Sequence, residues 1–191
     1  MQKAAMLWRS SYQELKHVRN ITTAAMFMAV SVVLGYFTIE AGPYLKIGFG
    51  PIVNQFVYYL FGPVFGACYG GVLDLVKYVV KPTGTFFFGF TFDAMLGGVL
   101  YGSVLYKRPL SFKRALAANF LVALICNVFF NTLWLSIMSG KGILALLPMR
   151  LLKNLIKWPV DAALFYLIAK RMEAVGLVRS IRGLSAQGKG L

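Results

Sequence analysis

Charged residues inside a long apolar stretch are the feature that most limits how this chain folds. From Tyr44 to Tyr106 the sequence is almost continuously hydrophobic, yet it contains Asp74, Lys77, Lys81 and Asp93. A charge near the centre of a membrane-spanning helix costs about 2.5–3.5 kcal/mol on insertion scales, so such residues usually face a bundle interior or a water-filled cavity. The stretch therefore predicts a membrane protein with a polar binding site between its helices.

The composition agrees with a membrane location. Hydrophobic residues make up 59% of the chain and charged residues only 14%, and the mean hydropathy is +0.69. No long polar segment separates two folded units, so we expect a single membrane domain over 1–191 with a basic tail over 171–191. Cys68 and Cys126 lie in apolar runs, which favours buried thiols over a disulfide. The polar N-terminal stretch is not typical of a cleavable signal peptide.

A helix needs about 20 mostly apolar residues to cross a membrane. By this criterion we expect an all-α protein, a bundle of six transmembrane helices. These are placed near 20–39, 51–62, 64–80, 89–106, 115–138 and 148–170. The second and third segments are short, and Gly62-Pro63 between them is compatible with two helices or with one kinked helix.

The basic residues predict the orientation of this bundle. Of the 20 lysines and arginines, 13 precede the first expected span, connect the fourth to the fifth, or follow the sixth. The positive-inside rule places these segments, and both termini, in the cytoplasm of a multi-pass cell-membrane protein. Anchoring to the lipid bilayer accounts for most of the net charge of +14, so nucleic acid is not an expected partner.

Seven basic residues depart from that rule, because they fall in the outer halves of helices or in outer loops. They are Lys46, Lys77, Lys81, Lys141, Arg150, Lys153 and Lys157. Too few acidic residues share the region to neutralise them, which favours an anionic ligand. For Lys46, Lys141 and Lys157, snorkelling to lipid headgroups is an equal alternative.

Helical spacing collects polar side chains on shared faces. One face carries Asp74, Lys77, Tyr78 and Lys81, and another carries Asn127, Asn131 and Trp134. In each set the residues are three or four positions apart, which places them side by side on a helix. Two amides and an indole suit recognition of a heteroaromatic ring by hydrogen bonds and stacking. Hydrogen bonding between helices is the alternative for the asparagines.

Two further segments add candidate ligand groups. In the expected sixth helix, Arg150 and Asn154 are one turn apart, and a guanidinium can bind a carboxylate through two hydrogen bonds. A breaker cluster at 82–84 leads into an aromatic run that includes Phe87 and Phe90. These rings either stack on a planar ligand or form an aromatic belt at the membrane interface.

Five segments between Val18 and Lys170 carry a resemblance to a known family. In chain order they read YLKIGFG, FGPVFGACYGGVLDLVKY, KPTGTFFFGFTFDAMLGGVLYG, NTLWLSIMSGKG and LLPMRLLKN. This order resembles the substrate-binding S component of energy-coupling factor (ECF) vitamin transporters, most closely the folate family. The last two segments are the most particular to the folate branch.

The resemblance implies a binding subunit of an ABC importer rather than an enzyme. Such a protein captures a vitamin outside the cell and docks on a module of one transmembrane coupling protein and two ATPases, toppling in the bilayer when ATP drives the module. The chain has no G-x-x-x-x-G-K-[ST] phosphate loop, so the ATPase partners are expected to use the ATP and no cofactor is expected here. The resemblance places the docking face on the first helix, where Ala25 and Ala29 allow close helix approach.

Folate joins a pterin, an aminobenzoyl ring and a glutamate with two carboxylates, and the candidate residues divide accordingly. For the pterin edge we expect Asp93, Asn127 and Asn131; for stacking Trp134, Phe87 and Phe90; and for the carboxylates Arg150, Lys81 and Lys153, with Asn154 beside Arg150. Asp74 is expected to pair with Lys77 or Lys81 and so to shape the pocket.

Other function classes are tested by the same residues. A serine protease needs a histidine beside its nucleophile, but the single histidine, His17, precedes the first span. Paired His and carboxylate ligands at helical spacing, as a metal hydrolase requires, are absent from the sequence. An S component for another vitamin and a self-sufficient secondary carrier of an organic anion stay open, and dependence on ATP and a partner distinguishes the carrier.

Overall fold

The chain forms a helical bundle with one short β-hairpin. The computed structural model describes residues 2–36, 38–41, 45–82, 85–140, 142–176, 178 and 181, without the side chains of 2–5, 38–41, 45–48, 145 and 146. The elements are α1 (Gln2–Glu14), α2 (Val18–Tyr36), β1 (Thr38–Ala41), β2 (Leu45–Gly48), α3 (Gly50–Phe61), α4 (Pro63–Val80), α5 (Phe88–Leu105), α6 (Phe112–Val122), the π-helix η1 (Ala123–Phe130), α7 (Asn131–Ser139) and α8 (Ile143–Ala174).

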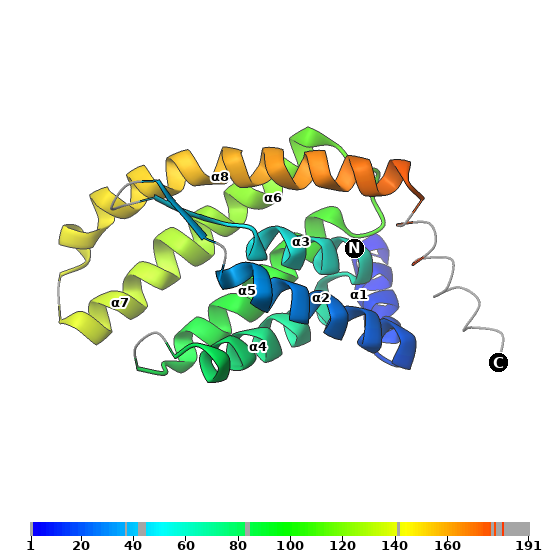
Figure 1. Cartoon of the computed structure of the whole chain (residues 1–191), viewed down its shortest axis with the longest axis horizontal. Coiled ribbons are helices and arrows are strands. Elements are labelled where there is room, and N and C mark those ends of the chain that lie inside the picture. Colours follow the sequence, from blue (N-terminus) through cyan, green and yellow to red (C-terminus); the bar gives the residue numbers. More distant parts are fainter. Residues whose placement is uncertain are drawn as a thin grey trace.

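The helices lie roughly along one axis, so the bundle has two distinct ends (Figure 1). α1 and the C-terminal end of α8 lie at one end, whereas the hairpin, α7 and the turn from α4 to α5 lie at the other. α6, η1 and α7 follow one another as a continuous helix across the bundle, and α8 returns beside α6.

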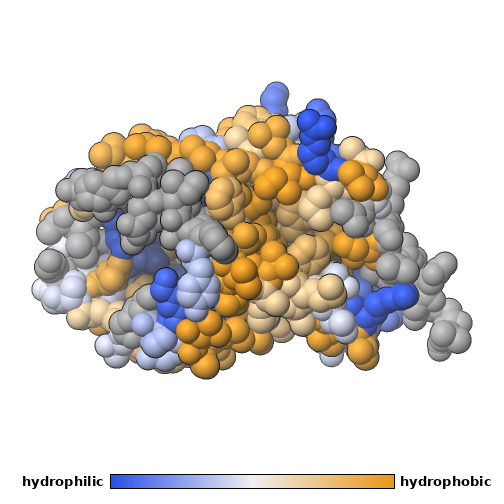
Figure 2. Space-filling view, viewed as in Figure 1, coloured by the Kyte–Doolittle hydropathy of each residue, from blue (hydrophilic) through white to orange (hydrophobic). Residues whose placement is uncertain are grey.

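Four helices among the described residues are long and apolar enough to cross a membrane. They are Val18–Tyr36, Pro63–Val80, Phe88–Leu105 and the continuous Phe112–Ser139. The expected spans over 51–62 and 148–170 correspond to helices that do not meet this criterion. α3 has 12 residues, roughly 18 Å at 1.5 Å per residue, and α8 carries several charges. Hydrophobic residues dominate the visible face, with hydrophilic residues in clusters near its borders (Figure 2).

The Gly62-Pro63 break produces two separate helices rather than one kinked helix. Gly62 has a φ of 87°, a left-handed conformation that favours glycine. Pro63 occupies the first turn of α4, where its missing N–H is no loss. Ser11 of α1 supplies the cap that this helix start lacks: its Oγ accepts hydrogen bonds from the backbone N–H groups of Val64 at 3.0 Å and Phe65 at 3.2 Å.

α4 and α5 pack closely against each other, because glycines line the contact between them. A Cβ built on Gly98 would lie 2.2 Å from the backbone oxygen of Gly66, and one on Gly70 would lie 2.4 Å from that of Ala94. Only small residues permit such an approach between membrane helices. The close contact fixes the positions of Asp74 and Lys77 on α4 relative to Asp93 on α5.

Two elements were not expected from the sequence. α1 is too polar for a membrane span, but it packs on α4 and buries Ser11 and Glu14. The antiparallel β1–β2 hairpin pairs Thr38 with Gly48. It lies in a Gly- and Pro-containing segment that a search for apolar helices does not detect.

Candidate functional site

A cavity in two connected compartments opens between the helices. The inner compartment has a volume of about 250 Å³ and the outer one about 470 Å³. Asp74, Lys77 and Asp93 line both compartments, so they mark the junction. The outer volume lies within the range of about 300–1,000 Å³ that is typical of small-molecule sites.

The inner compartment is built mostly from polar side chains on five helical elements. Its polar lining residues are Asn54, Gln55, Tyr58, Asp74, Lys77, Asp93, Tyr101, Asn127, Lys157 and Asp161, and Cys126 also lines it. The outer compartment combines aromatic rings with cations. Its lining residues besides those at the junction are Tyr78, Lys81, Thr85, Phe86, Phe87, Phe90 and Asn131.

Hydrogen bonding and ring packing order the junction and the outer wall. Thr91 of α5 donates from Oγ1 to Oδ2 of Asp74 on α4 at 2.8 Å. Phe87 packs against Phe90 with ring centroids 6.0 Å apart and against Trp134 at 5.5 Å. The aromatic wall is therefore a packed cluster that joins the start of α5 to α7.

Asp93 is a buried carboxylate in this cavity whose hydrogen-bonding capacity is largely unused. The residue is 9% exposed, and neither carboxylate oxygen has a hydrogen-bond partner of ordinary geometry among the described residues. The indole N–H of Trp134 interacts with the carboxylate but falls outside that geometry. Because burying a carboxylate without good partners is costly, Asp93 is suited to accept hydrogen bonds from a bound molecule.

The predicted site residues fall into two groups. Six of them line the cavity. Asp93 lines both compartments, Asn127 lines the inner one, and the outer one is lined by Lys81, Phe87, Phe90 and Asn131. The other four, Trp134, Arg150, Lys153 and Asn154, are not among the lining residues of either compartment. Trp134 stands behind the wall, stacked on Phe130 with centroids 6.1 Å apart.

Arg150 and Asn154 lie one turn apart on α8, but they have different partners. Arg150 donates from Nη1 to Oδ1 of Asn131 at 2.6 Å. Asn154 donates from Nδ2 to the backbone oxygen of Arg150 at 2.9 Å, so its amide forms a hydrogen bond within α8. Lys153 is exposed on α8. Through its hydrogen bond to Asn131, Arg150 contacts a residue that lines the outer compartment.

Of the two pairings expected for Asp74, the one with Lys77 is supported by the charge interaction between these residues. Lys77 lies one turn further along α4. Asp74 also accepts a hydrogen bond from Thr91. The ammonium of Lys81 lies 5.1 Å from the ring centroid of Tyr36, a cation–π distance. Lys81 therefore connects the mouth of the cavity to the end of α2.

Several lining residues were missed by the sequence analysis. The most important are Asn54, Gln55, Tyr58, Tyr101 and Asp161. Asn54 and Gln55 could have been predicted, because they are amides inside an apolar helix, as are Asn127 and Asn131. The π-helix η1 carries Cys126 and Asn127 into the same compartment, and π-helical turns often occur at functional sites.

The proposed docking residues lie on the outer surface of α2. Ala25 and Ala29 are exposed, whereas Ala24, the next residue around the helix, is buried in the core. Within the part of the chain that the structure describes, no group of three His, Cys, Asp or Glu residues could hold a metal ion.

Comparisons with known proteins agree on one family. A family model described as "ECF transporter, substrate-specific component" matches residues 19–169. The folate transporter FolT of Clostridium novyi is 30% identical over 167 residues, covering 87% of this chain and 97% of the relative. FolT of Leuconostoc mesenteroides is 30% identical over 156 residues, covering 78% and 84%.

A solved structure is similar to this chain in both fold and sequence. A crystal structure of FolT bound with folic acid superposes with a TM-score of 0.73 at 30% identity, covering 81% of this chain and 95% of that one. The family model covers all residues that line the cavity, and the family is a transporter component, not an enzyme. This chain belongs to the substrate-specific components of ECF transporters.

Proposed function

We propose that this multi-pass membrane protein is the folate-binding subunit of an ECF-type importer. The observation that carries the proposal is the buried Asp93 carboxylate at the junction of an aromatic, cation-bearing compartment and an amide-rich one. Folate has complementary parts in the same order: a hydrogen-bonding pterin, an aromatic linker and two carboxylates. The relatives named folate transporter FolT, and the FolT structure bound with folic acid, support this assignment.

The pterin is assigned to the inner compartment. Its 2-amino group and N3–H are adjacent donors, and a carboxylate can accept both in parallel. Asp93 supplies that carboxylate, with the amide of Asn127 beside it in the same compartment. Asn131 lines the outer compartment next to the aromatic wall, at the point where the pterin meets the aminobenzoyl ring.

The aminobenzoyl ring and the glutamate are assigned to the outer compartment. Phe87 and Phe90 offer ring surface there, and Trp134 supports them from behind. Lys81 stands at the mouth for the carboxylates. Arg150 contributes through Asn131, and the exposed Lys153 adds positive charge outside the mouth.

The proposed topology has six membrane-spanning helices in one membrane domain, with both termini in the cytoplasm. α3 and α8 complete the set, α3 as a short helix surrounded by others. α1 and the end of α8 lie at the same end of the bundle (Figure 1), which supports an even number of spans. The opposite end, where α4 meets α5, then opens the cavity to the extracellular side.

The proposed partners are one transmembrane coupling protein and two ATPases. Ala25 and Ala29 on the outer face of α2 supply the small-residue contact with the coupling protein. The ATPases use the ATP, the toppled subunit delivers folate inward, and the chain itself needs no cofactor.

Calorimetry on the purified chain in detergent tests the proposal. Folic acid is expected to bind one-to-one with a submicromolar dissociation constant without ATP, and riboflavin, thiamin and pantothenate are not. Asp93→Asn should weaken folic acid binding by more than about tenfold, because hydrogen bonds to charged groups contribute about 1.5–3 kcal/mol. Lys113→Ala, an exposed cation at the start of α6, is the matched control. Tight binding of another vitamin instead of folic acid would overturn the ligand assignment.

A second experiment separates the importer from a secondary carrier. The chain is reconstituted in vesicles alone, and then with the coupling protein and the ATPases. Uptake that needs both the partners and ATP supports the proposal, whereas uptake by the chain alone would overturn it.

A further inference from the structure

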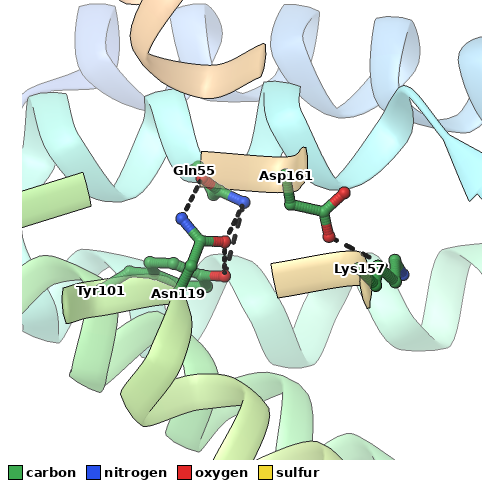
Figure 3. Close-up of polar contacts among 5 residues, drawn as sticks. All are labelled: Gln55, Tyr101, Asn119, Lys157 and Asp161. Carbon is green, nitrogen blue, oxygen red and sulfur yellow. Dashed lines mark hydrogen bonds and ion pairs between the residues drawn. The ribbon is translucent and has the colours of Figure 1, made fainter. Parts of the chain in front are cut away.

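The floor of the inner compartment contains a polar cluster whose members satisfy one another. Tyr101 donates to Oδ1 of Asn119 at 2.8 Å, and Gln55 donates to the same oxygen at 3.2 Å. Asn119 donates back to Oε1 of Gln55 at 3.3 Å and to the backbone oxygen of Ala115 at 3.0 Å. Figure 3 shows this closed arrangement between α3, α5 and α6. Groups paired in this way hold the bundle together and have little capacity left for a ligand.

Asp161 of α8 lies beside this cluster and differs from it. The residue is 8% exposed and lines the inner compartment. One carboxylate oxygen, Oδ2, lies 3.9 Å from the ammonium of Lys157. The other, Oδ1, is buried and has no hydrogen-bond partner among the described residues. Figure 3 shows the ion pair of this carboxylate with Lys157. Because a buried acceptor without a donor costs about 1–3 kcal/mol, a ligand N–H would stabilise it.

The two carboxylates that lack full hydrogen bonding, Asp93 and Asp161, lie at different places in the cavity. Asp93 lines both compartments, whereas Asp161 lines only the inner one and comes from a different helix. The third carboxylate of the compartment, Asp74, already accepts a hydrogen bond from Thr91. A ring that reaches the inner compartment past Asp93 therefore has a second acceptor at another part of its perimeter.

The two carboxylates favour one oxidation state of the pterin over another, an inference that rests on the proposed folate function. In every folate the 2-amino group and N3–H form one donor edge, which the proposal above gives to Asp93. Ring atoms N5 and N8 are acceptors in folic acid, but both carry hydrogen in tetrahydrofolate. A carboxylate facing an acceptor nitrogen is repelled, whereas one facing N–H forms a charge-assisted hydrogen bond.

We propose that Asp161 accepts a hydrogen bond from a ring N–H found only in reduced pterins, so that the cavity selects reduced folates over folic acid. Lys157 holds the carboxylate in place by their ion pair. The Gln55–Asn119–Tyr101 cluster provides the rigid floor behind it.

The test compares tetrahydrofolate with folic acid on the same purified full-length chain. Dissociation constants are measured by calorimetry under anaerobic, reducing conditions, in the unmodified protein and in Asp161→Asn and Asp93→Asn. Tetrahydrofolate should bind the unmodified protein at least about tenfold more tightly, since one tenfold step corresponds to about 1.4 kcal/mol. Asp161→Asn should reduce that ratio several-fold, because the amide can donate to the acceptor nitrogens of folic acid.

The ratio is an internal control for folding and for ring shape. Partial unfolding lowers the active fraction for both ligands alike, and the puckered reduced ring is the same in every variant. Asp93→Asn should weaken both ligands while leaving their ratio unchanged. A ratio near one in the unmodified protein, or an equal ratio in Asp161→Asn, would overturn the inference. Failure of both ligands to bind the unmodified protein would instead overturn the proposed folate function.

Discussion

Arg150 donates a hydrogen bond from Nη1 to Oδ1 of Asn131 at 2.6 Å, which joins α8 to α7 at the edge of the outer compartment. Asn131 lines that compartment, and Arg150 does not. The guanidinium thus holds the amide oxygen of a residue that lines the cavity. This assigns Arg150 a positioning role in place of the direct carboxylate contact that the sequence suggested.

Arg150→Ala is expected to weaken folate binding by more than about tenfold, because it releases Asn131 and removes a cation near the mouth. Calorimetry on Arg150→Ala, Asn131→Ala and the double variant measures the coupling. If Arg150 acts through Asn131, the double variant should lose less affinity than the two single losses combined.

Lys113→Ala again serves as the control, because it removes an exposed cation at the start of α6. Expression and membrane insertion should stay the same in all variants. Unchanged affinity in Arg150→Ala would remove Arg150 from the site, and strictly additive losses would rule out the positioning role.

The positions of the main helices could be read from the sequence because apolar length and breakers define them. The expected 64–80 and 89–106 correspond to Pro63–Val80 and Phe88–Leu105. The expected sixth helix begins at 148, but α8 begins at Ile143 and contains Pro148 and Pro159 inside it. Proline is disfavoured inside a helix, so the sequence alone does not predict an extension through Pro148.

The site was only partly predictable, because helical periodicity assigns a face but not its neighbour. Asp93 and Asn127 face the cavity, whereas Lys153 points to the surface. Asp161 was not selected, since nothing in its sequence neighbourhood distinguishes a ligand-facing acid from a partner of Lys157. That distinction needs the position of Oδ1 relative to every other helix.

The α4–α5 contact predicts a sharp difference between adjacent glycines. A Cβ at Gly98 would meet the backbone of Gly66 at 2.2 Å, while one at Gly97 would meet only Cγ1 of Val122 at 3.9 Å. Gly98→Ala should therefore force the helices apart and destabilise the protein by about 1–3 kcal/mol. Thermal unfolding in detergent measures the effect.

Gly97→Ala is the matched control for stability, and its melting temperature should equal or exceed that of the unmodified protein, because alanine favours the helix. Equal melting temperatures for Gly98→Ala and Gly97→Ala would show that the close approach of the two helices does not limit stability.

Ser11→Ala tests whether α1 stabilises the break at Gly62. The substitution leaves the N–H groups of Val64 and Phe65 without the Ser11 oxygen and also removes the 2.8 Å hydrogen bond to the backbone oxygen of Phe61. Loss of a cap and of buried partners should cost about 1–3 kcal/mol. The melting temperature should fall, with folate affinity unchanged in the folded fraction.

Ser139→Ala is the control for this effect, because that exposed hydroxyl bonds only within its own helix, to the backbone oxygen of Leu135. A fall in melting temperature of the same size in both variants would contradict a special role for Ser11.

Bulky residues on the outer face of α2 should separate binding from transport. Ala25 and Ala29 are exposed, so Ala25→Trp and Ala29→Trp should leave the cavity intact while preventing the close helix approach that docking requires. Folate binding in detergent is expected to match the unmodified protein, and uptake by vesicles containing the coupling protein and the ATPases should be abolished. Val30→Trp, at an exposed position on another side of α2, should transport normally. Lost binding in the alanine variants would indicate misfolding, and retained uptake would place the docking face elsewhere.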